Sequence, residues 1–375
     1  MSARLVLNRA VDRVGLYPAA LKTILSRARE AEARAAIGSW PGYAPTPLHD
    51  LDWLARDLGL ASVAYKDEGP RFGLGSFKAL GGAYAVAKLV AANGGRPLTV
   101  ACATDGNHGR SVAWGAQRAG CACVIYVHAN VSPGRIAAIA RYGAEVRVVA
   151  GTYDESVRKA AADAAAEGWT VVSDTSWDGY TEIPKDVMQG YAVMVAEAIE
   201  RVGAPPTHVF VQGGVGGVAA AVVAHLWEML GPARPRVIVV EPDKADCLTR
   251  SVEAGRIAFA EGDLDTVMAG LSCAEPSPLA WTILERGADA FMAIQDATIA
   301  PAMRALADHG IVGGESGVAG LAALDLAARD ATMRVALALG PSSRVLLFGT
   351  EGATDPEVYA SLVGRTHDDV TRRNA

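Results

Sequence analysis

The sequence has few cysteines, few aromatic residues and no long apolar run. Its five cysteines are an odd number in a chain of 375 residues, and Cys121 and Cys123 lack the spacing of a zinc-binding pair. No segment reaches the roughly 20 apolar residues of a membrane span, and the first residues lack the apolar run of a signal peptide. We therefore expect a cytoplasmic protein with reduced thiols and no metal.

Positive charge is not concentrated anywhere in the chain. There are 35 lysines and arginines against 41 aspartates and glutamates, which gives a net charge of -6. Because there is no basic block, we expect neither nucleic acid nor anionic membranes as partners. Hydrophobic residues make up 51% of the chain, enough for a sizeable core, and its length fits about two domains of roughly 150 residues each.

What the sequence does contain is an alternation of short apolar runs with alanine-rich stretches of helical period, such as 152–167. This alternation predicts an α/β protein with parallel sheets covered by helices. The four runs between about 98 and 174 form a compact group, which we expect to be one lobe. The expected strands are 98–103, 123–128, 145–150, 170–173, 207–212, 236–241 and 344–348.

Unusual loops follow several of these runs, at the strand ends where open parallel sheets bind ligands. The loop 104–110 combines Asp105, Asn107 and His108 between glycines. A simple turn with a helix cap is the alternative there. The loops 173–180 and 349–355 are also polar, and each has an Asx-rich turn as its alternative.

A glycine-rich loop, 212–218 with the sequence "QGGVGGV", comes between a strand and a helix. Bare backbone donors at the start of a helix predict a phosphate cradle. Gly214, Gly216 and Ala219 also match the dinucleotide fingerprint, with Glu241 near the place of a ribose-binding acid. A glycine turn without a ligand is the third possibility.

Lys78 lies in the stretch "GLGSFKALGG", among small and apolar residues. Because an unpaired ammonium is costly to bury, such a lysine is kept for chemistry or reaches solvent. Together with the glycine loop, it predicts a Schiff-base lysine for pyridoxal 5'-phosphate, the cofactor that acts as an electron sink. We expect the pKa of Lys78 to be lowered, as imine formation requires.

These motifs resemble those of the fold-type II pyridoxal-phosphate enzymes, the tryptophan synthase β and threonine dehydratase superfamily, and within it the diaminopropionate ammonia-lyases. The resemblance runs from about residue 40 to 360, and the form Thr-Asp-Gly-Asn-His-Gly at 104–109 is its most specific part. The matching stretches are 71–82, 104–114, 173–180, 212–217, 269–279, 314–321 and 349–355.

The resemblance implies a role for each matching residue. Lys78 carries the cofactor, and Asn107 contacts its phenolic oxygen. Thr350 faces the pyridine nitrogen, and Asp105 and Asp174 lie near the substrate as catalytic groups. The phosphate is held by Gly213, Gly214, Val215, Gly216 and Gly217.

The resemblance also implies a two-lobed fold, each lobe a mostly parallel sheet flanked by helices, with the active site in the cleft. Residues 1–84 and 181–375 form the large cofactor-binding domain, and 85–180 the small domain. The implied reaction is β-elimination of ammonia from 2,3-diaminopropionate, from both enantiomers, to give pyruvate and ammonia. We further expect a homodimer.

Three other functions are weighed against this one. Serine or threonine dehydration on the same fold is the main alternative. A nicotinamide-dependent dehydrogenase would leave Lys78 and the 104–110 loop unexplained. A non-catalytic ligand-binding relative is disfavoured because Lys78 and Asp105 are both present. A disulfide between Cys247 and Cys273 is a further hypothesis, against which the reduced setting argues.

Overall fold

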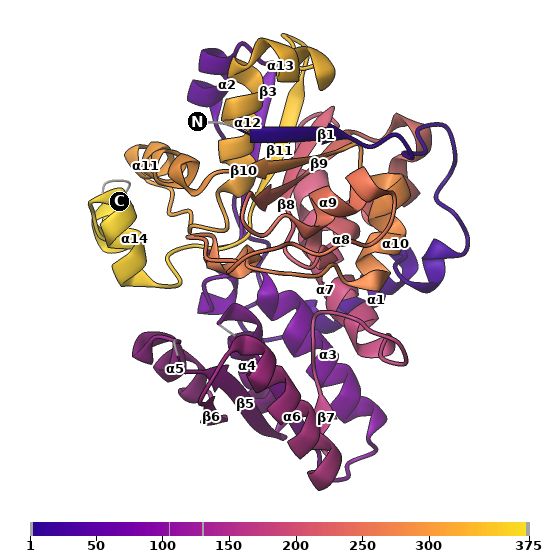
Figure 1. The fold of residues 1–375 in the computed structure, drawn as a ribbon, viewed down its shortest axis with the longest axis vertical. Helices are drawn as coiled ribbons and strands as arrows, with labels where there is room; N and C mark the ends of the chain where they lie inside the picture. The colour runs from indigo at the N-terminus through magenta and orange to yellow at the C-terminus, as the bar shows by residue number, and fades with distance from the viewer. Residues whose placement is uncertain (1–2, 105, 130, 373–375) are drawn as a thin grey trace.

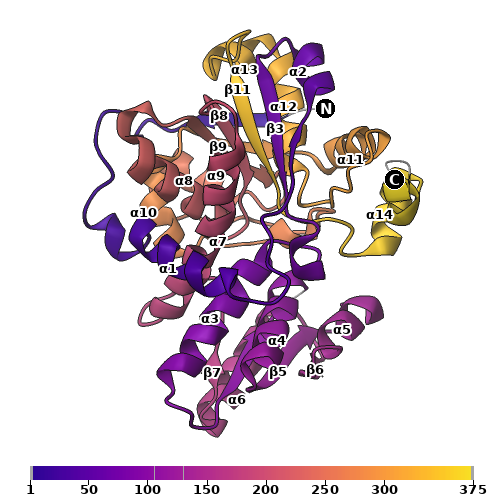
Figure 2. The same ribbon diagram turned by 180° about the vertical axis from the view of Figure 1, so that it is seen from behind.

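The chain forms two β-sheets, each covered by helices, in a computed structural model that describes residues 3–104, 106–129 and 131–372. Figure 1 shows the larger sheet in the upper part of the molecule and the smaller one below it, with α3 running between them. From behind, α3 and α7 again lie where the two parts meet (Figure 2). This arrangement confirms the predicted α/β fold with two mostly parallel sheets.

The larger sheet has seven strands in the order β1-β10-β9-β8-β11-β3-β2. Its five central strands are parallel, whereas β1 and β2 pair antiparallel at the two edges. The last strand of the chain, β11, thus lies between β8 and β3. The strands are β1 (Ala3–Leu7), β2 (Leu48–Asp50), β3 (Ser62–Asp67), β8 (His208–Gln212), β9 (Arg236–Pro242), β10 (Ala290–Ile294) and β11 (Arg344–Gly349).

The smaller sheet has four parallel strands in the order β6-β5-β4-β7. Successive side chains of its strands point to opposite faces. Val100 and Cys102 pack into the core shared with α3 and α4, whereas Ala101 packs against α6. The strands are β4 (Thr99–Ala103), β5 (Ala122–His128), β6 (Glu145–Val149) and β7 (Thr170–Val171).

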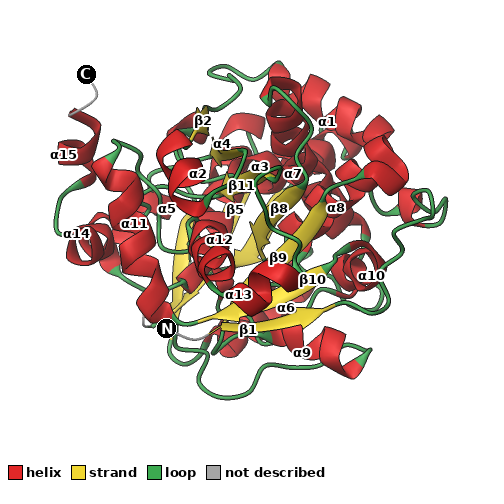
Figure 3. Cartoon of the chain, turned by 90° about the horizontal axis from the view of Figure 1, so that it is seen from above, coloured by secondary structure: helices red, strands yellow, loops and turns green. Residues whose placement is uncertain are grey.

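Helices lie on both sides of the larger sheet, as the view from above shows (Figure 3). The smaller sheet packs against α3 and α4 on one face and against α6 on the other. Apolar runs without alternation form the strands because both of their faces are buried. The helices are α1 (Arg27–Gly38), α2 (Asp52–Leu58), α3 (Lys78–Ala92), α4 (Asn107–Ala119), α5 (Pro133–Ala140), α6 (Tyr153–Glu167), α7 (Glu182–Arg201), α8 (Gly217–Leu230), α9 (Cys247–Ala254), α10 (Pro278–Gly287), α11 (Ile299–Asp308), α12 (Ala319–Arg329), α13 (Ala331–Ala336), α14 (Pro356–Val363) and α15 (His367–Arg372).

A fully buried cluster of charges precedes the lysine segment. Lys66 of β3 donates to Glu197 of α7 at 2.6 Å, and Arg71 donates to the same carboxylate at 2.7 Å and to Glu68 at 2.8 Å. Two cations and two anions are thereby matched and hydrogen-bonded, which is the condition for burying charge without a large penalty. The cluster fixes the backbone just before residues 73–78.

All seven expected strands are present, with ends that differ by at most two residues. Four more strands, β1, β2, β3 and β10, were missed. Of the helices in the described parts of the chain, none is long and apolar enough to cross a membrane.

Candidate active site

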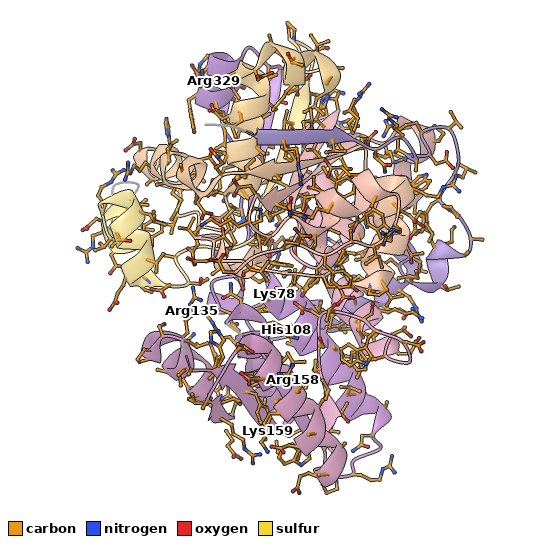
Figure 4. All side chains as sticks on the ribbon, viewed as in Figure 1. Lys78, His108, Arg135, Arg158, Lys159 and Arg329 are labelled. Carbon is orange, nitrogen blue, oxygen red and sulfur yellow. The ribbon has the colours of Figure 1, made fainter. Side chains whose placement is uncertain are left out.

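Lys78 begins α3 and faces Asp174, which follows β7 of the smaller sheet. The Lys78 ammonium donates a hydrogen bond to Asp174 Oδ2, and each side chain is 21% exposed. Figure 4 places Lys78 where the two parts of the molecule meet, with His108 close below it. The lysine thus neither lies free in an apolar pocket nor extends into solvent.

This ion pair reverses one expectation from the sequence. Burial disfavours the charged lysine, but the Asp174 carboxylate outweighs burial, so the pKa of Lys78 is raised above its usual value. Burial acts against the charged aspartate too, but the charge of Lys78 outweighs burial and lowers the pKa of Asp174. The predicted lowering of the lysine pKa was wrong because the sequence does not show the partner carboxylate.

Aromatic rings and a neutral histidine complete the surroundings of the lysine. The Lys78 nitrogen lies 5.3 Å from the ring centre of Phe77 and 5.6 Å from that of Tyr191. Burial lowers the pKa of His108, whose Nε2 lies 3.1 Å from the Val172 carbonyl. In the neutral form Nε2 donates to that carbonyl, which leaves Nδ1, 3.9 Å from Asp174 Oδ2, without a proton.

The glycine loop at the start of α8 presents unused backbone donors. Gly213 donates its N–H to Val240, but the next four N–H groups have no acceptor among the described residues. Four such donors at the positive end of a helix form a ready anion site. These four belong to Gly214, Val215, Gly216 and Gly217.

Two positions of the loop, Gly214 and Gly216, leave little room for a side chain. Gly216 has a φ of +94°, and a Cβ there would lie 3.0 Å from Leu284. A Cβ on Gly214 would lie 3.0 Å from Cys273 Sγ, and one on Gly217 would lie 3.8 Å from the Asp174 carbonyl. The anion site therefore adjoins the Lys78–Asp174 pair.

Thr350 lies beside the lysine segment, because its carbonyl accepts the Phe77 N–H at 3.0 Å. Its hydroxyl accepts a hydrogen bond of 2.6 Å from the side-chain amide of Gln212. A hydroxyl that accepts from an amide keeps its own proton to donate. Thr350 can thus donate to an acceptor such as a ring nitrogen.

Asn107, at the start of α4, is held from both ends of its side-chain amide. Its Nδ2 donates to Glu351 at 2.6 Å, and its Oδ1 accepts from Arg110 at 2.9 Å. Glu351 also accepts the Ser316 N–H at 2.9 Å, so its carboxylate spans two segments of the chain. One N–H of Asn107 remains for a further acceptor.

A second carboxylate lies behind Glu351. Glu315 is 2% exposed, and burial, with the nearby Glu351, raises the pKa of Glu315 to about 8. Arg135 of α5 extends across to the larger part of the molecule, 3.6 Å from Glu315 and 3.5 Å from Asp355. Figure 4 shows this arginine between α5 and the upper part.

The structure brings Lys78, Asn107, Asp174, Thr350 and the 213–217 loop together at one place. Asp105 lies outside the described residues. Several residues beside this site had no role predicted from the sequence, although most of them lie inside the matching stretches. The missed residues are His108, Tyr191, Gln212, Glu315 and Glu351.

The position of Glu241 contradicts the hypothesis that the glycine loop binds a dinucleotide. This glutamate is fully buried and accepts hydrogen bonds from the Leu248 N–H, the Thr249 N–H and the Thr249 hydroxyl, at 2.7 to 2.8 Å. It caps the start of α9 and cannot reach a ribose.

The disulfide hypothesis is wrong for this structure, in which Cys247 and Cys273 lie on either side of Gly214 and are not joined by a disulfide. In the parts of the chain that the structure describes, no group of three or more His, Cys, Asp or Glu could hold a metal.

Comparison with known proteins agrees with this geometry. Residues 39–350 match the model of the pyridoxal-phosphate dependent enzyme family. The chain is 43% identical over 349 residues to the diaminopropionate ammonia-lyase of Escherichia coli (strain K12), covering 86% of this chain and 88% of that one.

Solved structures of the Escherichia coli enzyme are also similar to this chain. One is its complex with D-serine, and another its complex with an aminoacrylate-PLP azomethine reaction intermediate. Both have a TM-score of 0.90 and cover 96% of this chain and 97% of that chain, at 38% and 39% identity. This chain therefore belongs to the pyridoxal-phosphate-dependent enzymes. Within that family, it is similar to the diaminopropionate ammonia-lyases.

The cofactor of this family is pyridoxal phosphate, and the residues present fit it. The four unused N–H groups suit a phosphate, and the glycines leave room for its oxygens. Lys78 offers the amine, Thr350 a hydroxyl proton and Asn107 an amide proton. All lie around the place where the two sheets meet.

Proposed function

We propose that this protein is a pyridoxal-phosphate-dependent ammonia-lyase that acts on 2,3-diaminopropionate and accepts both of its enantiomers. With one water consumed, each substrate molecule gives pyruvate and two molecules of ammonia. The observation that carries this proposal is the Lys78–Asp174 pair beside four free backbone donors, in a chain similar to diaminopropionate ammonia-lyases. The D-serine complex of the Escherichia coli enzyme supports acceptance of D-amino acids.

When bound, pyridoxal phosphate withdraws electrons from the bonds at the substrate Cα. The N–H groups of residues 214–217 would hold its phosphate, Asn107 would donate to its phenolic oxygen, and Thr350 would donate to its ring nitrogen. A hydroxyl donates a hydrogen bond there without transferring a full proton, as an acid would. A ring nitrogen that is only hydrogen-bonded withdraws electrons less strongly than a protonated one. Weaker electron withdrawal favours prompt loss of the β-substituent over reactions that need a long-lived carbanion.

Two groups move protons in this proposal. The amine of Lys78 removes the proton from Cα on its own face of the substrate. Asp105 protonates the departing amine, or removes the Cα proton from the opposite face of the D-isomer. Asp174 holds the Lys78 ammonium until the lysine is needed as a neutral amine.

We also propose that residues 1–84 and 181–375 form the cofactor-binding domain and residues 85–180 the small domain. Membership of the two sheets supports this division, because β4 to β7 all fall within 85–180. We further propose that the protein is a homodimer and that it is located in the cytoplasm. The second proposal is supported by the described cysteines, which form no disulfide.

The test of the reaction is a substrate screen that measures pyruvate and ammonia from D- and L-2,3-diaminopropionate, serine and threonine. Both diaminopropionate isomers should be turned over faster than either hydroxy amino acid. Faster release of pyruvate from serine, or of 2-oxobutanoate from threonine, would assign the protein to the dehydratases.

The roles of Lys78 and Asp105 need separate variants. Lys78→Ala should lose the borohydride-trapped cofactor adduct and essentially all turnover. Asp105→Asn should keep the cofactor and slow elimination from the D-isomer by ~100-fold or more. Asp178→Asn, which changes an exposed residue at the outer end of the 173–180 loop, is the control and should change neither. Near wild-type turnover of both isomers by Asp105→Asn would reduce Asp105 to a turn-forming residue.

A further inference from the structure

A cavity of about 360 Å³ lies at the amino ends of β8, β9 and β11, on the edge of the large sheet away from the active site. Gln212 and Thr350 lie at the carboxyl ends of β8 and β11, beside Lys78. Strands of five residues span ~17 Å, so the cavity is well separated from the lysine. Its lining includes His208 and four arginines, Arg13, Arg234, Arg236 and Arg344.

Two carboxylates, Asp12 and Asp289, act on these arginines, but among the described residues only Arg13 forms a direct ion pair. Arg13 pairs with Asp289 at 3.3 Å, and none of the other three forms an ion pair within the described residues. Arg344 instead donates to the Pro205 carbonyl at 2.7 Å, and Arg13 to the Arg234 carbonyl at 2.7 Å. Carbonyl groups fix where a guanidinium lies but leave its charge in place.

Two of the arginines are available in different ways. Arg236 is exposed and makes no side-chain hydrogen bond to any described residue. Arg234 is 1% exposed and stacks on Trp227 with 4.3 Å between its guanidinium carbon and the ring centre, and its Nε has no acceptor. Arg234 also donates to the Asp12 and Gly231 carbonyls, so it is held rigidly in the wall, and Arg236 is the guanidinium free to close on a ligand.

The cations also disfavour one another. Burial and the charge of Arg13 lower the pKa of Arg234 to about 10. Burial lowers the pKa of His208, and the charges of Arg236 and Arg13 lower it further. In a chain of net charge -6, this concentration of positive charge is local, and an anion in the cavity would relieve it.

We propose that this cavity is a binding site for a small phosphate-bearing anion, separate from the cofactor site. A guanidinium group can donate two parallel N–H hydrogen bonds to two oxygens of one phosphate. The volume lies within the roughly 300–1,000 Å³ of small-molecule sites. Pro205, Pro206 and Pro235 supply an apolar wall for the rest of the ligand.

The test is calorimetric titration of pyrophosphate into the enzyme loaded with pyridoxal phosphate, so that the cofactor's own phosphate site is filled. Arg236→Gln removes a charge that holds no described residue in place, and Arg256→Gln removes one exposed charge elsewhere. Pyrophosphate should bind the wild type and Arg256→Gln equally, and Arg236→Gln at least tenfold more weakly. Equal affinity in all three proteins, or no binding to the wild type, would overturn the proposal.

Two further titrations identify the kind of anion. Adenosine monophosphate that binds more tightly than inorganic phosphate, with the same loss in Arg236→Gln, would support a phosphate ester that also uses the proline wall. Citrate that binds more tightly than pyrophosphate would overturn the assignment to phosphate, because the site would then favour carboxylates.

Discussion

The side-chain amide of Asn107 and the carboxylate of Glu351 are joined by a hydrogen bond of 2.6 Å, although 244 residues separate them in the chain. Asn107 begins the helix that follows β4 of the small sheet, and Glu351 follows β11 of the large sheet. The bond therefore connects the carboxyl ends of the two sheets at the cofactor site.

Glu351→Ala should weaken cofactor binding by about tenfold or more, because losing a hydrogen bond to a charged group costs ~1.5–3 kcal/mol. Without the carboxylate, the amides of Asn107 and Ser316 also lose their acceptor. Titrating apoenzyme with pyridoxal phosphate and following absorbance gives the Kd. Glu351→Gln keeps one acceptor oxygen and should lie between the wild type and the alanine variant. An unchanged Kd for Glu351→Ala would show that Asn107 needs no such support.

Asp174→Asn should shift the pH dependence of cofactor capture to lower pH. The Asp174 carboxylate raises the pKa of Lys78, and a protonated amine cannot attack the cofactor's aldehyde. With asparagine in place, the largest effect that raises the pKa of Lys78 is lost and burial, the largest effect of all, lowers it. Stopped-flow reconstitution of apoenzyme between pH 6 and 9 measures the shift. Asp178→Asn, which changes an exposed residue of the same loop, is the control and should follow the wild-type profile. A wild-type profile for Asp174→Asn as well would show that the ion pair does not set the pKa of the Lys78 amine.

Gly216→Ala should reduce cofactor retention. An alanine at φ +94° is strained by ~1–2 kcal/mol, and its Cβ would lie 3.0 Å from Leu284 and 3.2 Å from Ala280. The loop must then shift, and the free N–H groups move with it. Gly203→Ala is the control, because no atom lies within 4 Å of its added Cβ. Cofactor occupancy after dialysis is the measurement, and equal occupancy in the two variants would count against the cradle.

Glu315→Gln should make stability less dependent on pH. The pKa of Glu315 is about 8 in the folded protein, against 4.5 for an exposed glutamate. Between these values the folded chain binds a proton that the unfolded chain does not, so the free energy of unfolding falls as pH rises and levels off above pH 8. Urea unfolding from pH 5 to 8 measures the slope.

The slope should become shallower in Glu315→Gln without vanishing, because Glu241, with a pKa of about 8, titrates over the same interval. Glu357→Gln, an exposed glutamate of α14, should keep the wild-type slope. A wild-type slope in Glu315→Gln as well would mean that Glu315 is ionised in the folded protein throughout.

The sequence predicted three of the five central strands of the large sheet, because strands buried on both faces leave continuous apolar runs. It missed β10 although that strand is also a fully buried apolar run. It also missed β3, whose Lys66 makes the run look exposed. Its partner Glu197 lies 131 residues away, and no local pattern reveals that pairing. The edge strands β1 and β2 are short and partly exposed, so they lack the same signal.

The part of the site formed by loops at the carboxyl ends of strands in one sheet was predictable from the sequence. Loops after parallel strands of one sheet share an edge, so the glycine loop and Thr350 could be expected together. The contact of Asn107 with Glu351 depends on how the two sheets meet, which no motif encodes. The charge of Lys78 likewise depends on Asp174, 96 residues away.

The place of β11 has a consequence for the protein during its synthesis. This strand comes after every other described strand in the chain, yet it lies between β8 and β3 in the middle of the large sheet. The sheet cannot close until residues 344–349 have left the ribosome, so until then β8 and β3 of a nascent chain each keep an unpaired edge. We expect a nascent chain to depend on chaperones until this strand is available. We also expect products that terminate before residue 344 to aggregate.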